Sequence, residues 1–143
     1  MDIFNLFTLV AATFTGASMG SFLLVTLLYV PLLKTPDNLI NNLTIYRRLY
    51  RLNTVLCLLA GVCAALIKNQ SAAVLLTILA ASYVFNHAHI LKGILKACNE
   101  HYCIVNPSVY RSLSGLQNVL HFCQFAGAGY VIYLLALAPP AIN

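Results

Sequence analysis

Long apolar runs alternate with short polar links along the whole chain. The apolar runs cover residues 3–33, 45–67, 72–97 and 110–138. A transmembrane helix needs about 20 mostly apolar residues to cross about 30 Å of hydrocarbon, so each run is long enough to span a membrane. Short links make consecutive helices antiparallel neighbours. The pattern therefore predicts an all-α fold, a four-helix antiparallel transmembrane bundle in which residues 1–143 form a single integral membrane domain.

The composition agrees with a membrane protein and excludes other classes. Of the 143 residues, 61% are hydrophobic and 8% are charged, whereas roughly a quarter of an ordinary soluble domain is charged. Too few polar groups remain to cover the surface of a water-soluble fold of this size. Intrinsic disorder is excluded because it requires low hydrophobicity and high net charge. We therefore expect the lipid bilayer to be a partner of this chain.

The basic residues are divided unequally between the two ends of the predicted bundle. Four crossings place both termini and the second link on one side, and the first and third links on the other. Since cytoplasmic segments carry an excess of Lys and Arg, we expect a multi-pass protein with both termini on the outer side. Its basic links then face the cytoplasm or an equivalent inner compartment, where anionic headgroups or an anionic ligand, and not nucleic acid, are the expected partners. Lys68 alone lies near the outer side, and the inner side holds Lys34, Arg47, Arg48, Arg51, Lys92, Lys96 and Arg111.

Small residues recur every fourth position on the first predicted helix, at Ala12, Gly16 and Gly20. In lipid, helices associate where small residues let two backbones approach closely. The stripe therefore predicts helix packing within the bundle or an interface in a homo-oligomer, and the sequence does not distinguish the two.

Polar residues follow single faces of the last three predicted helices. Steps of three and four residues keep side chains on one helical face, and polar groups inside a bilayer are costly unless each has a partner or a cavity. The third helix carries Ser82, Asn86, His89, Gly93 and Lys96 in such steps, the fourth carries Ser114, Gln117, His121 and Gln124, and the second carries Tyr46, Tyr50 and Asn53 beside Arg47 and Arg51.

Two of these residues, His89 and His121, lie at similar depth on different helices. At 1.5 Å per residue they are roughly 13 Å and roughly 17 Å inside the helix ends on the basic side. Three interpretations follow from this coincidence. In the first, the polar residues form a structural interhelical hydrogen-bond network. In the second, they line a cavity that opens on the basic side and ends near His121. In the third, the two histidines ligate a metal or a b-type haem.

Acidic residues are scarce, which limits the chemistry available to the chain. The only acids are Asp2, Asp37 and Glu100, so general acid–base catalysis by a pair of carboxylates is excluded. Any proton transfer would fall to His, Tyr or Cys side chains. The sequence leaves open whether the protein is an enzyme.

The layout resembles that of the MAPEG family, the membrane-associated eicosanoid and glutathione metabolism proteins. In that family the second helix begins with Arg-x-Tyr-Arg followed by Asn, and here Arg48-Leu49-Tyr50-Arg51 is followed by Asn53. The family's third helix carries Tyr, Arg, Tyr and Gly in steps of four, three and three. This chain keeps the steps but lacks the Arg and the second Tyr, and it has no counterpart of the family's Glu in the second helix. The resemblance implies four helices and a basic pocket for the carboxylates of glutathione. The corresponding positions of the third helix are Tyr83, His87, Ile90 and Gly93.

Three functional hypotheses remain. The first is a polar, basic cavity in the inner half of the bundle that binds a small amphipathic, anionic or redox ligand, because the planar guanidinium of Arg binds carboxylate or phosphate bidentately. The second is an accessory or assembly subunit of a larger membrane complex, such as a respiratory complex, without chemistry of its own. The third is a haem or quinone electron-transfer protein with His89 and His121 as metal ligands. The candidate ligand-binding residues are Arg47, Arg48, Tyr50, Arg51, Asn53, Asn86, His89, Lys96, Gln117, His121 and Gln124.

Overall fold

The computed structural model describes residues 3–25, 39–97 and 106–137, and every long element in these ranges is helical. Four helical segments are long and apolar enough to cross a membrane, which confirms the predicted all-α fold with four spans. The chain is therefore a polytopic membrane protein. The first span is α1 (Ile3–Leu23), the second α3 (Leu39–Leu66) and the fourth α6 (Pro107–Ala136), while the third is made of α4 (Gln70–Phe85), a π-helical turn η3 (Asn86–Ile90) and α5 (Leu91–Lys96).

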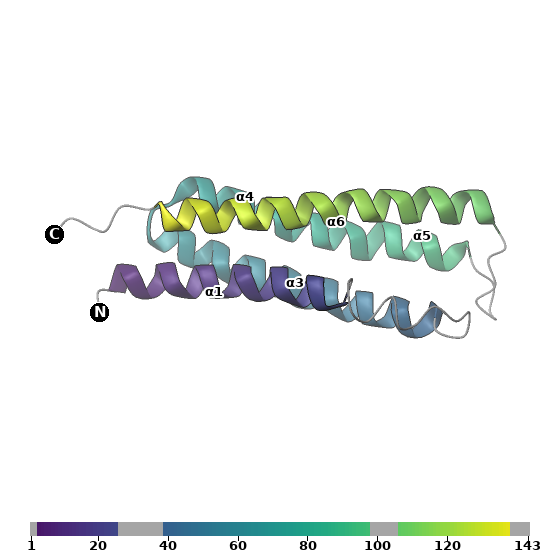
Figure 1. Cartoon of the computed structure of the whole chain (residues 1–143), viewed down its shortest axis with the longest axis horizontal. Coiled ribbons are helices and arrows are strands. Elements are labelled where there is room, and N and C mark those ends of the chain that lie inside the picture. The colour runs from purple at the N-terminus through teal and green to yellow at the C-terminus, as the bar shows by residue number, and fades with distance from the viewer. Residues whose placement is uncertain (1–2, 26–38, 98–105, 138–143) are drawn as a thin grey trace.

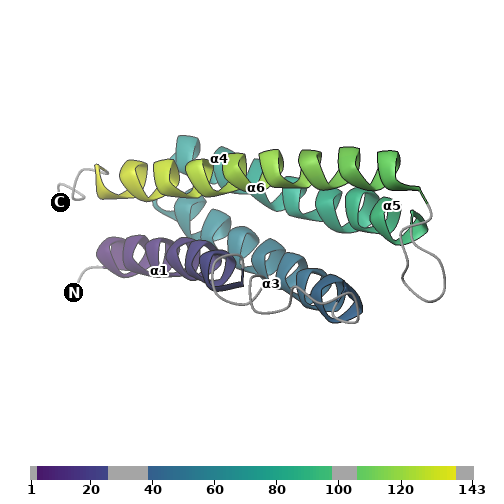
Figure 2. The ribbon, with the colours of Figure 1, turned by 45° about the vertical axis from the view of Figure 1, so that its right-hand side comes forward.

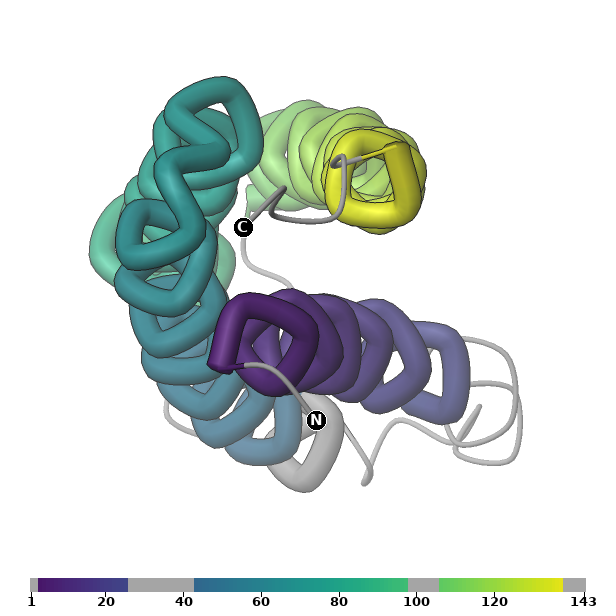
Figure 3. The backbone as a smooth tube through the Cα atoms, turned by 90° about the vertical axis from the view of Figure 1, so that its left-hand side faces the viewer, coloured from purple at the N-terminus to yellow at the C-terminus, as the bar shows by residue number. Residues whose placement is uncertain are grey.

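The four spans run antiparallel to their neighbours in sequence (Figure 1). Viewed from the end, α1 lies between α3 and α6, and α4 closes the ring from the other side (Figure 3). The beginning of α1, the turn after α3 and the end of α6 share one end of the bundle, which we call the Lys68 end. The opposite end, where α3 and α6 begin and α5 ends, is the basic end. Toward it, the α1–α3 pair and the α5–α6 pair diverge (Figure 2).

Local capping signals fix where the helices begin and end. α3 stops at a tight turn in which Lys68 has φ 58°, and the Asn69 N–H donates to the Ala64 carbonyl at 3.0 Å. A left-handed residue followed by such a hydrogen bond is a common helix C-terminal motif. The Asn69 side chain then accepts from the Ala72 N–H at 3.1 Å and so caps α4. At α6, Asn106 is the N-cap and Pro107 is the first helical residue, where its missing N–H is not needed.

The core differs between the two ends of the bundle. At the Lys68 end it is apolar and close-packed, because the buried alanines Ala60, Ala64 and Ala72 let α3 and α4 approach each other. Toward the basic end the buried residues include Asn, Gln, His, Ser and Thr side chains. Most of the outer surface of the spans is apolar, as Phe122 illustrates with an exposed fraction of 73%. Such a surface is stable in lipid and not in water.

The glycines fall into two groups. A Cβ atom added at Gly93 would lie 2.7 Å from the Leu113 side chain, and one added at Gly127 would lie 3.1 Å from Leu79, so these two positions serve helix packing within the chain. A Cβ atom at Gly16 or Gly20 meets nothing within 4 Å in the described structure. The stripe of small residues on α1 is therefore not fully used by the packing of these helices.

Candidate functional site: a buried polar cluster and a basic-end pocket

The Tyr50 hydroxyl is the centre of a buried hydrogen-bond cluster that joins α3 to α6. It accepts a hydrogen bond from Gln117 Nε2 at 2.6 Å and lies 2.7 Å from His121 Nε2. The side chain of Tyr50 is 1% exposed, and Gln117 and His121 are buried as well. Because the Gln117 amide nitrogen can only donate, the hydroxyl hydrogen of Tyr50 is free to bond the unprotonated Nε2 of a neutral His121 ring. We call these three residues the Tyr50 cluster.

Aromatic rings from α1 and α3 enclose the His121 imidazole. The Phe22 ring lies edge-on, with its centroid 4.4 Å from that of His121, and the Tyr46 ring stacks on the imidazole at 5.7 Å. The imidazole of α6 is thereby packed against side chains of α1 and α3. A buried His with a hydrogen-bond partner and packed faces is fixed in orientation, which suits either a structural role or the recognition of a polar ligand group.

A second layer of polar contacts lies next to this cluster, toward the Lys68 end. The Ser21 hydroxyl donates to Asn53 Oδ1 at 3.0 Å and so connects α1 to α3. Gln124 Nε2 donates to the Ser82 hydroxyl at 2.9 Å, which connects α6 to α4. All four spans therefore contribute side chains to polar contacts in the interior of the bundle.

Several buried polar atoms have no hydrogen-bond partner among the described residues. They are the Nδ2 atom of Asn53, both side-chain polar atoms of Asn86, the Nε2 atom of His87 and the Oε1 atom of Gln124. Asn53 and Asn86 are 0% exposed. Buried polar groups nearly always have partners, so each exception calls for an explanation such as a water molecule or a ligand. Asn86 also begins the π-helical turn η3, and π turns inside α-helices occur frequently at functional sites.

The structure separates the predicted basic and polar residues into two groups. Tyr50, Asn53, Asn86, Gln117, His121 and Gln124 are buried in the bundle. Arg47, Arg48, Arg51, His89 and Lys96 are exposed on its outside. The structure therefore places these arginines on the outside of the bundle, apart from the buried polar residues.

The exposure of His89 and Lys96 has a geometric cause. On the third span the buried positions near these residues include Tyr83, Asn86, Ile90, Ile94 and Ala97. His89 comes one residue before the buried Ile90, and one residue turns a helical side chain by about 100°. Of the polar stripe expected to face inward, Asn86 is therefore buried, whereas His89 and Lys96 lie outside the buried face.

The two histidines do not fit a haem held between them. His121 points into the core and its Nε2 atom is in hydrogen-bond contact with Tyr50. His89 is exposed and stacks on the exposed ring of Phe85, with centroids 5.1 Å apart. Two histidines that hold one haem must project from their helices into the same gap. Here the His121 side chain faces the core, whereas the His89 side chain faces the outside of the bundle. Among the described residues, moreover, no three His, Cys, Asp or Glu side chains gather at one place.

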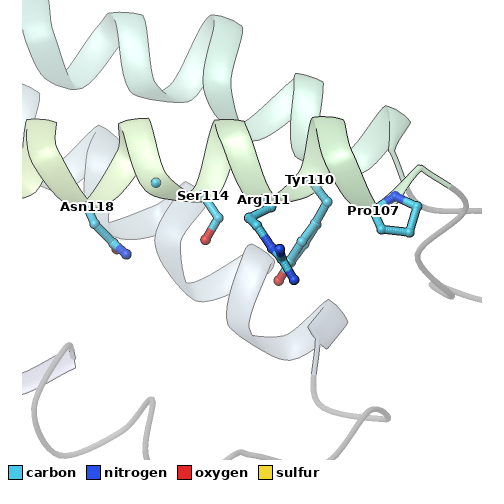
Figure 4. Close-up of a pocket in the computed structure, with 6 residues that line it drawn as sticks. Pro107, Tyr110, Arg111, Ser114 and Asn118 are labelled. Carbon is cyan, nitrogen blue, oxygen red and sulfur yellow. The ribbon is translucent and has the colours of Figure 1, made fainter.

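A pocket of about 430 Å³ lies beside the first three turns of α6, at the basic end. Figure 4 shows the side chains of Tyr110, Arg111, Ser114 and Asn118 projecting from one side of this helix. Tyr110 and Ser114 are half-buried, and Arg111 and Asn118 are exposed. The pocket therefore presents one guanidinium, two hydroxyls and one amide.

The sequence did not single out this pocket, although a signal for it exists. Arg111, Ser114 and Asn118 follow Pro107 in steps of four, three and four, which places them on one helical face. Ser114 also belongs to the polar stripe that leads to Gln117 and His121. Pairing that stripe with Arg111 would have identified the pocket.

Comparison with known proteins identifies no relative: the chain matches no protein-family model, no curated protein and no solved structure.

Proposed function

We propose that this membrane protein binds a small amphipathic anionic molecule at the basic end of the bundle. Its anionic group occupies the α6 pocket beside Arg111, and its polar portion extends toward the Tyr50 cluster. The observation that carries this proposal is a continuous line of polar side chains on α6. It runs from the pocket residues Arg111 and Ser114 to the buried Gln117 and His121.

The chemistry of the pocket favours an anion. The described part of the chain contains no Asp or Glu, so Arg111 has no carboxylate partner there. A guanidinium offers planar paired donors that match a carboxylate or a phosphate. The hydroxyl of Ser114 and the amide of Asn118 add further donors at the same face.

The spacing along α6 sets the size of the ligand's polar part. Ser114 precedes Gln117 by three residues and His121 by seven, so the three side chains share one helical face. Arg111 and His121 are ten residues apart, which corresponds to about 15 Å along the axis. A molecule with an anionic end and a second polar group within that length would reach both sites, and its apolar remainder would lie against lipid-facing side chains.

The pocket can be tested with a dansyl-labelled medium-chain fatty acid and its methyl ester as matched probes, each titrated into protein in a nonionic detergent. We expect the acid to bind more tightly than the ester. Arg111→Gln should weaken binding of the acid by about tenfold or more, because a hydrogen bond to a charged group contributes about 1.5–3 kcal/mol. Lys68→Gln, which removes a cation at the other end, is the control. Equal affinities for acid and ester would contradict the proposal.

The inner end of the proposed site needs a separate measurement. The imidazole signals of the protein, labelled with ¹⁵N at histidine, should shift on addition of the acid probe, and His121→Phe identifies which signal belongs to the core. If only the signals of the other histidines shift, and the signal missing from His121→Phe does not, the ligand is confined to the pocket and does not reach the Tyr50 cluster.

The resemblance to the MAPEG family bears on the class of ligand. Glutathione is an anionic, thiol-containing tripeptide, and we include it as a competitor of the fatty-acid probe. Tyr50 of the Arg48-Leu49-Tyr50-Arg51 motif lies in the core, while both arginines are exposed. A glutathione site built on these arginines would therefore lie on the outer surface of one chain and would require a second chain to enclose it.

A second candidate function is that of a subunit in a larger membrane assembly, either a homo-oligomer or a complex with other subunits. The observation that favours it is the open space at Gly16 and Gly20 on α1, since close approach at small residues drives helix association in lipid. We propose in addition that the basic end faces the cytoplasm. Native mass spectrometry tests the assembly, and labelling of a cysteine introduced at Lys68 with an impermeant reagent tests the orientation.

A further inference from the structure

Basic side chains gather on the outside of α3 and the third span. The π-helical turn η3, which carries His87, contacts α3, which carries Arg47 and Arg51 one turn apart, and the positive charges of both arginines and of Lys92 act on His87. The three charged side chains are exposed, and His87 is half-buried. The Nε2 atom of His87 is itself buried and has no hydrogen-bond partner in the described ranges. We call these four residues the basic cluster.

The π-helical turn helps to bring the cluster together. In an α-helix, five residues turn by about 500°, which would leave His87 and Lys92 about 140° apart around the axis. In η3 the Leu91 N–H donates to the Asn86 carbonyl, which is a hydrogen bond between residues five apart. This wider turn reduces the angle around the helix axis between two residues that are five positions apart. His87 and Lys92 are thereby brought toward the same side, next to the arginines of α3.

The cluster lies within the apolar part of the spans and not beyond it. The apolar part of the second span begins at Leu43, so Arg51 lies eight residues, or about 12 Å, inside it. Lys92 precedes Lys96, the last residue of the third span, by four residues, or about 6 Å. Nearby exposed side chains such as Val55 and Phe85 are apolar. Cations at this depth are costly unless they are paired with an anion or reach the interface.

We propose that the basic cluster binds the phosphate of an anionic phospholipid, whose acyl chains lie along the exposed apolar side chains of α3 and α4. The described part of the chain offers the cluster no carboxylate. Long Arg and Lys side chains reach from within a span to the interface, where the lipid phosphate is the available anion. The phosphate oxygens accept hydrogen bonds from the exposed side chains of Arg47, Arg51 and Lys92. This site uses other helices than the α6 pocket and does not depend on the function proposed above.

The test is native mass spectrometry of the protein in nonionic detergent with phosphatidylglycerol and phosphatidylcholine of identical acyl chains. We expect the wild type to retain phosphatidylglycerol preferentially. Since each cation near an anionic lipid contributes about 1 kcal/mol, Arg51→Gln should lower this preference about fivefold and Arg51→Gln with Lys92→Gln about 30-fold. The charge-conserving Arg51→Lys should retain most of it. Lys68→Gln, which removes a cation at the other end of the bundle and leaves the cluster intact, should leave it unchanged.

Three results would overturn the proposal: equal retention of both lipids by the wild type, an unchanged preference in the double variant, or displacement by inorganic phosphate at the concentration of the lipid. The last would assign the cluster to a soluble anion. If the double variant fails to fold, as judged by circular dichroism and gel filtration, the salt dependence of the wild type replaces it. The preference for phosphatidylglycerol should then fall as salt rises, and a salt-independent preference would count against an ionic site.

Discussion

Removal of the Tyr50 hydroxyl should destabilise the bundle measurably, because this one oxygen bridges two helices. In Tyr50→Phe, Gln117 Nε2 loses an acceptor at 2.6 Å and His121 Nε2 loses a partner at 2.7 Å. The aromatic ring, its 1% exposure and its packing against Tyr46 are retained. Interhelical hydrogen bonds in membrane proteins contribute about 0.6 kcal/mol on average and up to about 1.7 kcal/mol. Two lost bonds therefore predict a decrease of about 1 to 3 kcal/mol in the free energy of unfolding.

The measurement is reversible unfolding in mixed micelles, with sodium dodecyl sulfate as denaturant and far-ultraviolet circular dichroism as the signal. Tyr133→Phe is the matched control, since Tyr133 is on α6 and 57% exposed. Its free energy of unfolding should change by less than about 0.5 kcal/mol. A double-mutant cycle of Tyr50→Phe with Gln117→Leu then isolates the energy of that pair. The reasoning is refuted if Tyr50→Phe is no more destabilising than Tyr133→Phe.

Two further predictions concern packing and buried polar groups. Gly127→Ala should lower the free energy of unfolding by about 1 kcal/mol, because its Cβ atom would lie 3.1 Å from buried Leu79. Gly16→Ala, where that atom meets nothing within 4 Å, should not lower it, and the same unfolding assay ranks the two. Ser82→Ala should cost about 1 kcal/mol by leaving Gln124 Nε2 without its bond of 2.9 Å. Adding Gln124→Leu should restore most of that loss, and a larger loss in the double variant would contradict this explanation.

The spans could be predicted from the sequence because length and hydropathy are local properties of a chain. The ends of the spans differ by a few residues from those expected. α6 begins at Pro107 and not near residue 110, since Asn106 and Pro107 form the helix start themselves. The end of the predicted first span, beyond residue 25, lies outside the described residues.

The candidate site was predicted less completely. The spacing of Gln117, His121 and Gln124 indicated one face of α6, and the structure buries all three. The same argument applied to the third span included His89, which is exposed. Both stripes have helical spacing, but spacing alone does not say which face of a helix turns toward its neighbours. The π turn at Asn86 also has no signal in the apolar pattern.

The sequence by itself determined that this is a helical membrane protein, where its four spans lie and that its cations gather at one end. Each of these follows from residue type and from distance along the chain. Only the tertiary structure decided that Tyr50 meets His121, 71 residues away, and that the arginines of α3 face outward while Arg111 lines a pocket. The rotation of each helix about its axis is set by packing against its neighbours, and a difference of one residue turns a side chain by about 100°. The rotation of a helix therefore decides whether a polar side chain faces the interior of the bundle or the lipid.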